Sequence, residues 1–524
     1  MRKPAICETL LLFLFIVASS TGAYGQLDPV PFPTENPLTE EKRVLGKILF
    51  WDEQLSSDNT VACGTCHRAG AGGSDPRLGT HPGPDGLFGT SDDVIGSPGI
   101  ARHDLNGIPI FDPLFGNEVQ VTGRSAQTVI GAQWAPETFW DGRASSTFID
   151  PQTGLVSISS GGALESQAVA PLLSAVEMAF EGRTWGDLVT KMEAVVPLAL
   201  GTDLPADVAA ILVGGTDYPD LFAAAFGSPS ITAERIAYSI ATYERTLVPD
   251  QTPFDLGTMT MMQQAGLNIL TNNTVCLNCH VPPLFTDNEF YNIGLRPSDN
   301  DLGRFNITGV FEDRGRFKTP TLRNVSLRSA QMHVGWVTDV PDAIDFYNAP
   351  AWPTVDPVTG HTQFTADQSP IPAPGAPGAS PDYNDIQLPT QLQPMVIEFL
   401  TNGLTDPRVA NETFPFDRPT LQSELPTPPP VEFVRGDCNT DGANDISDAI
   451  TLLNVLFPPA TPPTMGCVDA CDGNDDGSIN IADAIAVLNS LFGNPAIPLP
   501  APASCGPDPT TAEALDCLTY QNCP

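Results

Sequence analysis

The chain has 524 residues, a formal net charge of −38 and only 16% charged residues. A chain of this length is expected to form two to four domains. The acidic balance excludes a nucleic-acid-binding protein, because phosphate recognition needs a basic face. It also disfavours an anionic membrane surface and favours a basic or neutral partner, although solubility and calcium binding explain much of the same charge.

The first 25 residues have the composition of a secretory signal. Arg2 and Lys3 form the charged region, residues 10–18 the apolar core, and residues 23–25 a small-residue cleavage site. The apolar run is too short to span a bilayer, and no longer run follows it. We therefore expect an exported protein without a membrane span, located in the periplasm, outside the cell or at the cell surface.

Two pentapeptides, residues 63–67 and 276–280, read C-x-x-C-H. This is the attachment signature of a c-type haem, in which two thiols bind one porphyrin and the next imidazole ligates its iron. A C-x-x-C pair alone also occurs in redox dithiols and zinc sites, but neither copy has the additional ligands of a zinc site. The sequence predicts two covalently bound haem c groups, held by Cys63, Cys66, His67, Cys276, Cys279 and His280.

Around these motifs the apolar residues recur mostly at helical spacing. Residues 26–45 are rich in proline and predict an extended arm, residues 40–50 a short helix, and residues 69–123 a long loop. Further helices are expected over 166–180, 184–198, 217–226, 232–247, 257–271, 342–348 and 391–401. The pattern predicts a mainly α fold with two cytochrome c-like haem domains, residues 26–255 and 256–405.

A composition break near Asp406 begins a Pro-rich segment, residues 406–434, which predicts a linker. Beyond it, two acidic loops repeat in register at 437–448 and 472–483, each followed by an Ala/Ile/Leu helix. Oxygen ligands at positions 1, 3, 5, 9 and 12, with Gly at position 6, are typical of calcium loops; two solvated acidic turns are the alternative. The predicted ligands are Asp437, Asn439, Asp441, Asp445, Asp448, Asp472, Asn474, Asp476, Asn480 and Asp483.

The duplicated loops resemble a type I dockerin module over residues 435–495. The resemblance implies a small α-helical EF-hand-like domain, two calcium ions and a cohesin-like docking partner. The last ninety residues, which include a tail over 496–524, contain six cysteines: Cys438, Cys467, Cys471, Cys505, Cys517 and Cys523. In an exported segment they predict up to three disulfides, whose pairing the sequence leaves open.

Several phrases around the haem motifs resemble, in the same order, those of the bacterial di-haem cytochrome c peroxidase superfamily, which includes the MauG-type maturation enzymes. They are Leu45-Gly46-Lys47-Ile48-Leu49-Phe50-Trp51, Phe139-Trp140-Asp141-Gly142-Arg143, Glu165-Ser166-Gln167-Ala168, Glu177-Met178, Phe285-Thr286-Asp287 and Lys318-Thr319-Pro320-Thr321-Leu322-Arg323-Asn324. The resemblance spans about residues 40–405. It implies an oxidoreductase that reduces hydrogen peroxide, or uses it to oxidise a protein partner, with electron transfer between the haems.

The resemblance also implies roles for single residues. In that family a Gln and a Glu ten residues apart line the pocket of the peroxide haem, and Gln167 and Glu177 have this spacing. Peroxide cleavage needs a carboxylate that moves a proton and a neutral group that holds the substrate; a solvated Glu177 is the alternative. Trp140 matches the electron conduit between the haems, or a core anchor, and Arg143 a propionate ligand, or a structural ion pair.

The axial ligands distinguish the branches of the family. No His stands at the position of the removable distal ligand of the peroxidases, and His81 and His103 lie much too early unless a loop returns one of them. For the second haem the resemblance places the sixth ligand at Tyr347, a position that Tyr occupies in the MauG-type branch and Met in the peroxidases; Met332 is the rival ligand. Ser125 replaces the Asn that helps to bind an interhaem calcium in the family, so that only backbone carbonyls remain for this ion.

Two classes of function are compatible with these residues. The first is a di-haem peroxidase whose electrons come from a small cytochrome or cupredoxin, or from a side chain of a partner protein. The second is a non-catalytic multihaem electron carrier, or a surface-docked haem protein. Gln167 and Glu177 argue against the second class, because a carrier needs no acid–base pair. An iron that is high-spin and consumes peroxide would distinguish the enzyme.

Overall fold

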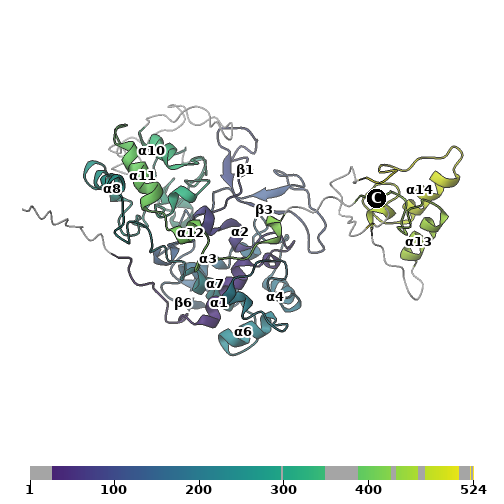
Figure 1. The fold of residues 1–524 in the computed structure, drawn as a ribbon, viewed down its shortest axis with the longest axis horizontal. Helices are drawn as coiled ribbons and strands as arrows, with labels where there is room; N and C mark the ends of the chain where they lie inside the picture. The colour runs from purple at the N-terminus through teal and green to yellow at the C-terminus, as the bar shows by residue number, and fades with distance from the viewer. Residues whose placement is uncertain are drawn as a thin grey trace, which may run out of the picture. The chain divides into compact units, whose positions relative to one another are not determined.

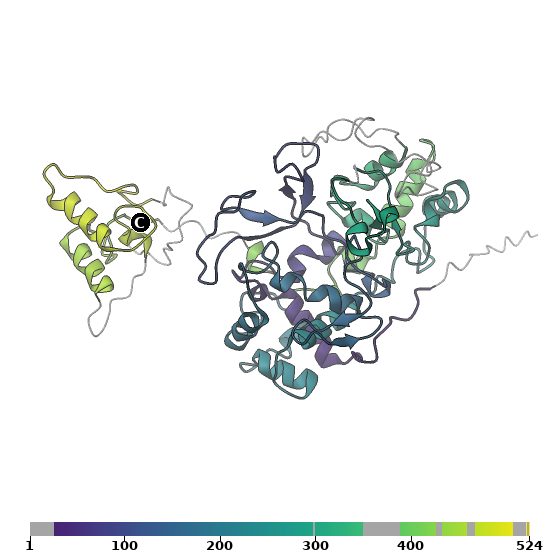
Figure 2. The same cartoon turned by 180° about the vertical axis from the view of Figure 1, so that it is seen from behind.

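The structure, a computed structural model, describes residues 26–296, 299–348, 388–425, 432–457, 467–506, 520 and 523. The predicted signal segment and Cys517 lie outside the described residues. The chain divides into two compact units, Met1–Leu425 and Pro426–Pro524 (Figures 1 and 2). Among the described helices, none has both the length and the apolar character needed to cross a membrane.

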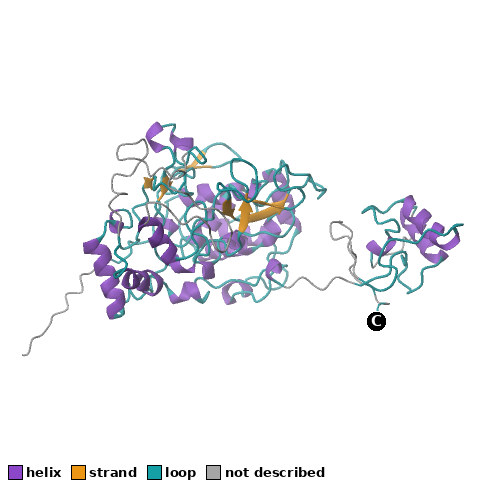
Figure 3. Cartoon of the chain, turned by 90° about the horizontal axis from the view of Figure 1, so that it is seen from above, coloured by secondary structure: helices purple, strands orange, loops and turns teal. Residues whose placement is uncertain are grey.

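Short helices and long loops make up most of the first unit, and its strands form small antiparallel pairs (Figure 3). The helices are α1 Glu40–Trp51, α2 Cys63–Cys66, α3 Ala163–Ala168, α4 Trp185–Ala194, α5 Ala206–Ala209, α6 Tyr218–Phe226, α7 Ala233–Glu244, α8 Met261–Asn273, α9 Phe305–Thr308, α10 Val340–Asn348, α11 Gln393–Glu398 and α12 Pro407–Ala410. The strand pairs are β1 Gly79–His81 with β2 Val94–Gly96, β3 Pro98–Ala101 with β4 Val119–Val121, β5 Phe148–Ile149 with β6 Val156–Ile158, and β7 Phe290–Tyr291 with β8 Phe317–Lys318. The expected mainly α fold is confirmed for this unit.

We call the part of the first unit that carries the first C-x-x-C-H motif its first half, and the part that carries the second motif its second half. The first half is built on the packed pair α1 and α7 (Figure 1). Both helices begin at a threonine whose hydroxyl accepts a backbone N–H, Thr39 for α1 and Thr232 for α7. Gly46 allows the close approach of the two helices, since a Cβ at this position would overlap the carbonyl oxygen of Ser239. The α1 side chains facing α7 are consequently buried, and Ile48 is fully so.

The second half has a separate core around α8 and α11. Gly266 of α8 lies against the carbonyl of Met395, again at a distance that excludes a larger residue. The rings of Phe254, Phe285 and Phe399 pack together with centroids 5.1 to 6.3 Å apart. Each C-x-x-C-H motif thus adjoins its own helical core, while both halves belong to one compact unit.

Most predicted helices match observed ones, but one does not. The expected helices over 184–198, 217–226, 232–247, 257–271, 342–348 and 391–401 correspond to α4, α6, α7, α8, α10 and α11. The helix expected over 166–180 is wrong: α3 ends at Ala168, a short turn follows at Pro171–Leu173, and the remainder is loop. Pro171 contributes to this break because it cannot donate a hydrogen bond to a preceding turn.

The segment expected as a long loop after the first motif contains β1 to β4. We call residues 78–121 the hairpin segment; Figure 2 shows its strands in blue at the edge of the first unit. Its inner side chains, among them Ile95 and Ile100, are buried. The N–H of Ile95 donates to the carbonyl of Val334 (2.9 Å), and the indole of Trp336 donates to the carbonyl of Asp93 (2.7 Å). The hairpin segment therefore ties the two halves together.

Part of the predicted linker is folded. Residues 407–425 pack against the first half of the unit, with Val409, Phe416 and Leu421 buried. These apolar residues follow no helical or strand period, so the sequence pattern did not distinguish them from a linker.

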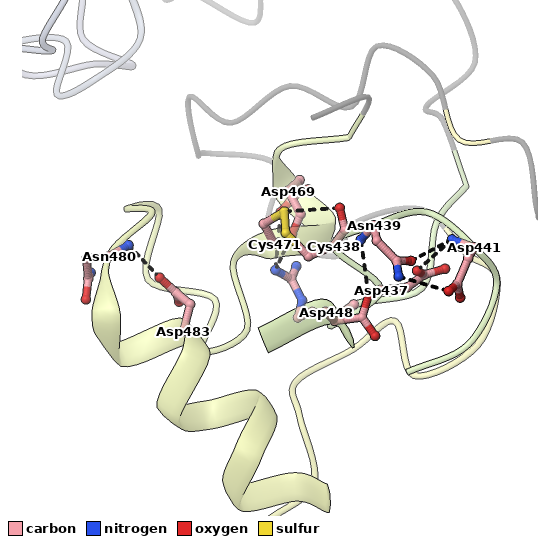
Figure 4. Close-up of a disulfide and its surroundings, with 10 residues drawn as sticks. Asp437, Cys438, Asn439, Asp441, Asp448, Asp469, Cys471, Asn480 and Asp483 are labelled. Carbon is pink, nitrogen blue, oxygen red and sulfur yellow. Dashed lines mark hydrogen bonds and ion pairs between the residues drawn. A yellow bond between two sulfur atoms is a disulfide. The ribbon is translucent and has the colours of Figure 1, made fainter. Parts of the chain in front are cut away.

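The C-terminal unit contains helices α13 Ile446–Leu456 and α14 Ile481–Phe492, which pack against each other. Disulfides join Cys438 to Cys471 and Cys505 to Cys523. The first disulfide connects the beginnings of the two acidic loops (Figure 4). The buried core of the C-terminal unit is small, which is typical of domains that depend on cross-links or ions.

Candidate functional site

A single large cavity of about 720 Å³ within the first unit is lined by both C-x-x-C-H motifs. None of the four cysteines of the motifs, all of which the structure describes, takes part in a disulfide. Two segments that are far apart in the sequence therefore open into the same cavity, as two neighbouring prosthetic groups require.

The local sequence places the first motif in a fixed orientation. Helix α2 is closed by the hydroxyl of Thr65, which accepts from the N–H of Ala62 (2.8 Å). Gly64 lies against the ring of Trp51, where a Cβ would overlap the indole. His67 donates from Nδ1 to the carbonyl of Gly73 (3.3 Å), which leaves Nε2 as the nitrogen available to a metal.

The second motif repeats this arrangement with different neighbours. Its cysteines flank a short 3-10 turn, Cys276–Asn278, and His280 donates from Nδ1 to the carbonyl of Phe285 (3.1 Å). Burial lowers the pKa of both His67 and His280, which keeps each imidazole neutral, the form that ligates iron.

Gln167 and Glu177 both line the cavity. Burial raises the pKa of both thiols of the first motif, and the Glu177 carboxylate adds to this rise. Gln167 lies in the last turn of α3, and Glu177 in the loop that follows. Part of the Glu177 surface stays open to the cavity, while burial by the surrounding protein raises the pKa of its carboxyl. The hairpin segment supports this loop from behind, because Gln120 donates from Nε2 to the carbonyl of Ala175 (2.7 Å).

Sequence reasoning missed a third polar residue, Glu244 at the end of α7. It lines the cavity, is 2% exposed, and its Oε2 has no hydrogen-bond partner among the described residues. Burial raises the pKa of its carboxyl to about 8. Its position was readable in principle, since it follows the buried Ile236 and Ile240 at intervals of four and so falls on the apolar face of the helix.

The second half of the unit contributes buried cations to the cavity wall. Lys318 and Arg328 line it and form no ion pair within the described part of the chain. Burial lowers the pKa of Lys318 to about 8 and that of Arg328 to about 10. The sequence by itself assigns no role to either side chain, because nothing in a single sequence distinguishes a buried cation from an exposed one.

Several donor atoms in this wall have no acceptor in the described chain. They are Nε of Arg328, Nε2 of Gln331 and Nε2 of His333, all within one loop that lines the cavity. Buried cations and donors without acceptors are costly unless an anion or another acceptor completes them. The propionates of a porphyrin are such acceptors. The thiol pairs, the histidines and these donors together fit covalently bound haem.

Tyr347 of α10 and Met332 both line this part of the cavity, so the two predicted alternatives for a sixth ligand lie within the same wall. Ser125, at the position of the expected calcium ligand, donates hydrogen bonds to two backbone carbonyls. Its N–H donates to the carbonyl of His333 (3.0 Å) and its hydroxyl to the carbonyl of Met332 (2.5 Å).

Two loops with the same backbone form the wall between the two motifs. Residues 138–144 and 331–337 each close with an antiparallel bridge between their first and last residues. Their second and fifth residues have positive φ: Phe139 (64°) and Gly142 (74°) in one, Met332 (63°) and Gly335 (69°) in the other. The two halves of the unit thus share a structural element that their sequences barely reveal.

Trp140 and His333 occupy the same position of these two loops. Both line the cavity, and their rings meet edge to face with centroids 6.3 Å apart. The indole of Trp140 donates to the carbonyl of Ser125 (2.8 Å), and Phe317 stacks on His333 at 3.5 Å. An aromatic cluster therefore stands in the wall that both motifs share.

The remaining predicted residues of this site have simpler environments. Arg143 lines the cavity, pairs with Asp141 (3.1 Å) and lies over the ring of Phe139. His81 and His103 belong to the hairpin segment, and neither lines the cavity. His81 accepts the N–H of Gly83 on Nδ1 (3.1 Å).

The two acidic loops of the C-terminal unit have the same internal hydrogen bonds; Figure 4 shows Asp437, Asn439, Asp441 and Asp448 of the first loop. The carboxylate at position 1, Asp437 or Asp472, accepts the N–H groups of positions 5 and 6. The carboxylate at position 12, Asp448 or Asp483, accepts those of positions 3 and 9. Each loop thus holds its first and last carboxylates by the same backbone groups.

Carboxylates converge most closely in the second loop. Asp472, Asp476 and Asp483 each offer a carboxylate oxygen within 4.8 Å of the others. Burial raises the pKa of Asp448 and Asp483 to about 6, and neighbouring carboxylates contribute to both shifts. A bound cation would relieve this repulsion.

Comparison with known proteins adds the following relationships. The family described as di-haem cytochrome c peroxidase matches residues 40–261. The chain is 30% identical to the methylamine utilization protein MauG of Methylorubrum extorquens, over 63% of this chain and 75% of that protein. It is 28% identical to the protein of the same name from Methylophilus methylotrophus, over 62% and 77%. It is 26% identical to the cytochrome c551 peroxidase of Nitrosomonas europaea, over 66% and 84%.

Proposed function

The chain belongs to the di-haem cytochrome c peroxidase family, and we propose from this premise that it is a peroxidase-type oxidoreductase whose peroxide site adjoins the first C-x-x-C-H motif. The observation that carries the assignment is the presence of Gln167 and Glu177 in the cavity wall, with the Glu177 carboxyl close enough to both thiols of the first motif to add to the rise in pKa that burial causes there. Among the described residues, the lining contributed by the second half includes Lys318 and Arg328 and no glutamate or aspartate. An acid–base group and a neutral hydrogen-bonding group are what peroxide cleavage requires.

Each residue has a defined task in this proposal. Haem c groups attached through Cys63, Cys66, Cys276 and Cys279, with His67 and His280 as ligands, supply the redox-active iron. Glu177 accepts a proton from one oxygen of hydrogen peroxide and returns it to the other oxygen, which leaves as water. The amide of Gln167 donates a hydrogen bond that orients the substrate. Two electrons and two protons convert one peroxide into two waters. The ring of Trp140 carries electrons between the two halves of the unit.

The electrons come from a protein in either branch of the family. We favour a MauG-like use, in which the donor is a side chain of a partner protein, over a small cytochrome or cupredoxin. Neither His81 nor His103 lines the cavity, which supports a peroxide site without a removable distal histidine. Tyr347 in the wall of the second half supports the same branch. The alternative of a pure electron carrier would leave Gln167 and Glu177 without a role.

The direct test is electron paramagnetic resonance of the isolated ferric protein before and after addition of peroxide. One high-spin signal that disappears with peroxide in the wild type, and is consumed far more slowly in Glu177→Gln, is the expected result. Two low-spin signals that do not respond to peroxide would favour the electron carrier.

For the C-terminal unit we propose a dockerin-like module that binds two calcium ions through the ten predicted oxygen ligands and docks the exported enzyme to a cohesin-like receptor. The matching hydrogen bonds of the two loops support this assignment. Calcium titration of the full chain by calorimetry should show two sites. Asp437→Asn and Asp472→Asn should each remove one, and affinity should fall as the pH drops below about 6, where Asp448 and Asp483 become protonated.

A further inference from the structure

The outer turns of the hairpin segment expose large apolar side chains. Exposed fractions reach 72% for Leu105 and Phe111, 62% for Leu87, 60% for Ile108 and 54% for Phe88. These turns belong to a packed element: the inner face of the same segment is buried, and its strands form two antiparallel pairs, β1 with β2 and β3 with β4. Exposed apolar groups that gather on a well-packed element mark an interaction site more often than scattered ones do.

The exposed side chains come from turns that contact one another. The ring of Phe115 packs against Phe88 (centroids 6.2 Å apart) and against His81 (5.7 Å). Leu114 adjoins Gly86, since its Cδ2 lies 3.4 Å from the position of a Cβ on that glycine. The turn at 85–90 and the turn at 111–116 therefore form one surface, which we call the apolar patch: Leu87, Phe88, Phe111 and Leu114.

The charge around the apolar patch is negative. The hairpin segment contains six acidic residues, Asp85, Asp92, Asp93, Asp104, Asp112 and Glu118, and a single Lys or Arg. Arg102, the single cation of the segment, forms ion pairs with Glu181 (3.1 Å) and Asp112 (3.8 Å), so its charge is neutralised locally. A patch with this rim repels an anionic membrane and a second copy of this acidic chain, and it attracts a basic protein.

The same segment reaches the peroxide site from its inner side. Ser97, Pro98 and Gly99, between and within its strands, line the cavity, and Gly99 lies directly against the backbone that carries Glu177. A protein bound on the outer turns would consequently be separated from the cavity by the thickness of the hairpin segment. This is a suitable place for a partner that exchanges electrons with the site.

We propose that the apolar patch and its acidic rim dock a basic protein that supplies electrons to the cavity. This inference rests on the proposed peroxidase function and names the class of its partner. The apolar centre contributes affinity by desolvation, and the carboxylates contribute the rate and orientation of association.

The patch docks a basic electron-donating protein whether its electrons come from a redox centre or from a side chain. The test uses the holoenzyme and, as a probe for any such protein, a small basic c-type cytochrome in the reduced state. Its affinity is measured by calorimetry without peroxide, and its peroxide-dependent oxidation is measured separately. We expect Phe88→Ser/Phe111→Ser to weaken binding about tenfold or more, and Asp85→Asn/Asp104→Asn to weaken it mainly at low ionic strength. The asparagines keep the side-chain oxygens that accept the N–H of Leu87 at position 85 and the N–H of Asn106 at position 104, so this second variant retains the fold.

Matched controls are Leu155→Ser on the β5–β6 turn and Glu193→Gln on α4, both exposed and outside the hairpin segment. They should bind the probe like the wild type. Turnover of peroxide with a small organic donor should be unchanged in every variant, and its absence in the wild type would contradict the proposed function without bearing on docking. A wild type that does not bind the probe, or patch variants that bind it as well as the controls do, would overturn the docking proposal.

Discussion

The two halves of the first unit present the same kind of motif to one cavity but surround it with opposite chemistry. Beside the first motif the wall contains carboxyls, Glu177 and Glu244, whose pKa values are raised by burial. Beside the second it contains cations, Lys318 and Arg328, whose pKa values are lowered by the same burial. The carboxyls that could move a proton thus belong to the first half, while cations of both halves, Arg143 in the first and Lys318 and Arg328 in the second, line the cavity.

The loops 138–144 and 331–337 show how this difference arises on a shared backbone. They have equivalent bridges and equivalent positive φ values, yet Asp141 of the first corresponds to Val334 of the second. Asp141 pairs with Arg124 (2.6 Å), whereas the carbonyl of Val334 receives the N–H of Ile95 from the hairpin segment. A repeated scaffold therefore fixes positions, and the side chains placed on it decide which half performs which chemistry.

Removal of one thiol pair at a time is expected to have the largest effect. Cys63→Ala/Cys66→Ala and Cys276→Ala/Cys279→Ala should each halve the covalent haem measured by the pyridine haemochrome assay. The first variant should lose all reaction with peroxide. The second should keep the optical change on mixing with peroxide and lose steady-state turnover. The reverse result would exchange the roles of the two halves.

Glu177→Gln keeps the shape of the side chain but removes its ability to accept a proton. We expect kcat/KM for peroxide to fall by about 10²- to 10⁴-fold. Burial raises the pKa of Glu177, so the ionised base is lost as the pH falls through this raised value, and wild-type activity should decline on the acid side. The variant should lack that acid limb. Glu244→Gln is the matched control and should retain it.

Tyr347→Met tests whether the second half holds its iron through the phenol oxygen. Replacement of an oxygen ligand by a thioether should raise the midpoint potential of one haem by on the order of 100 mV, measured by spectroelectrochemistry. Met332→Leu serves as its counterpart. A shift in the latter variant, with none in the former, would identify Met332 as the ligand.

The smallest expected effect concerns the stability of the first half. Glu244 ionises near pH 4.5 when unfolded but only near pH 8 when folded, so its contribution becomes increasingly unfavourable as the pH rises between these values. Glu244→Gln should therefore stabilise the holoprotein by about 1 kcal/mol or more at pH values above about 8, and have little effect near pH 4.5. Urea midpoints at the two pH values measure this difference. An equal change of the urea midpoint at the two pH values would mean that folding does not raise the pKa of the Glu244 carboxyl.

The sequence alone was sufficient wherever the relevant information is local. The C-x-x-C-H motifs and the repeat of two acidic loops are read from fixed spacings, and helices such as α6 and α7 from caps and apolar periodicity. It failed where tertiary contacts override the pattern, as in the break after Ala168 and in the buried residues around Phe416.

The tertiary structure alone decided which residues share the cavity. It brought both motifs to one wall, tied the halves through Ile95 and Trp336, and buried Glu244, Lys318 and Arg328 beside the site. The physical reason is that desolvation depends on the atoms that surround a group in space. The sequence around a glutamate in a helix, or around a lysine at the end of a strand, does not show which atoms will surround that side chain in the folded protein.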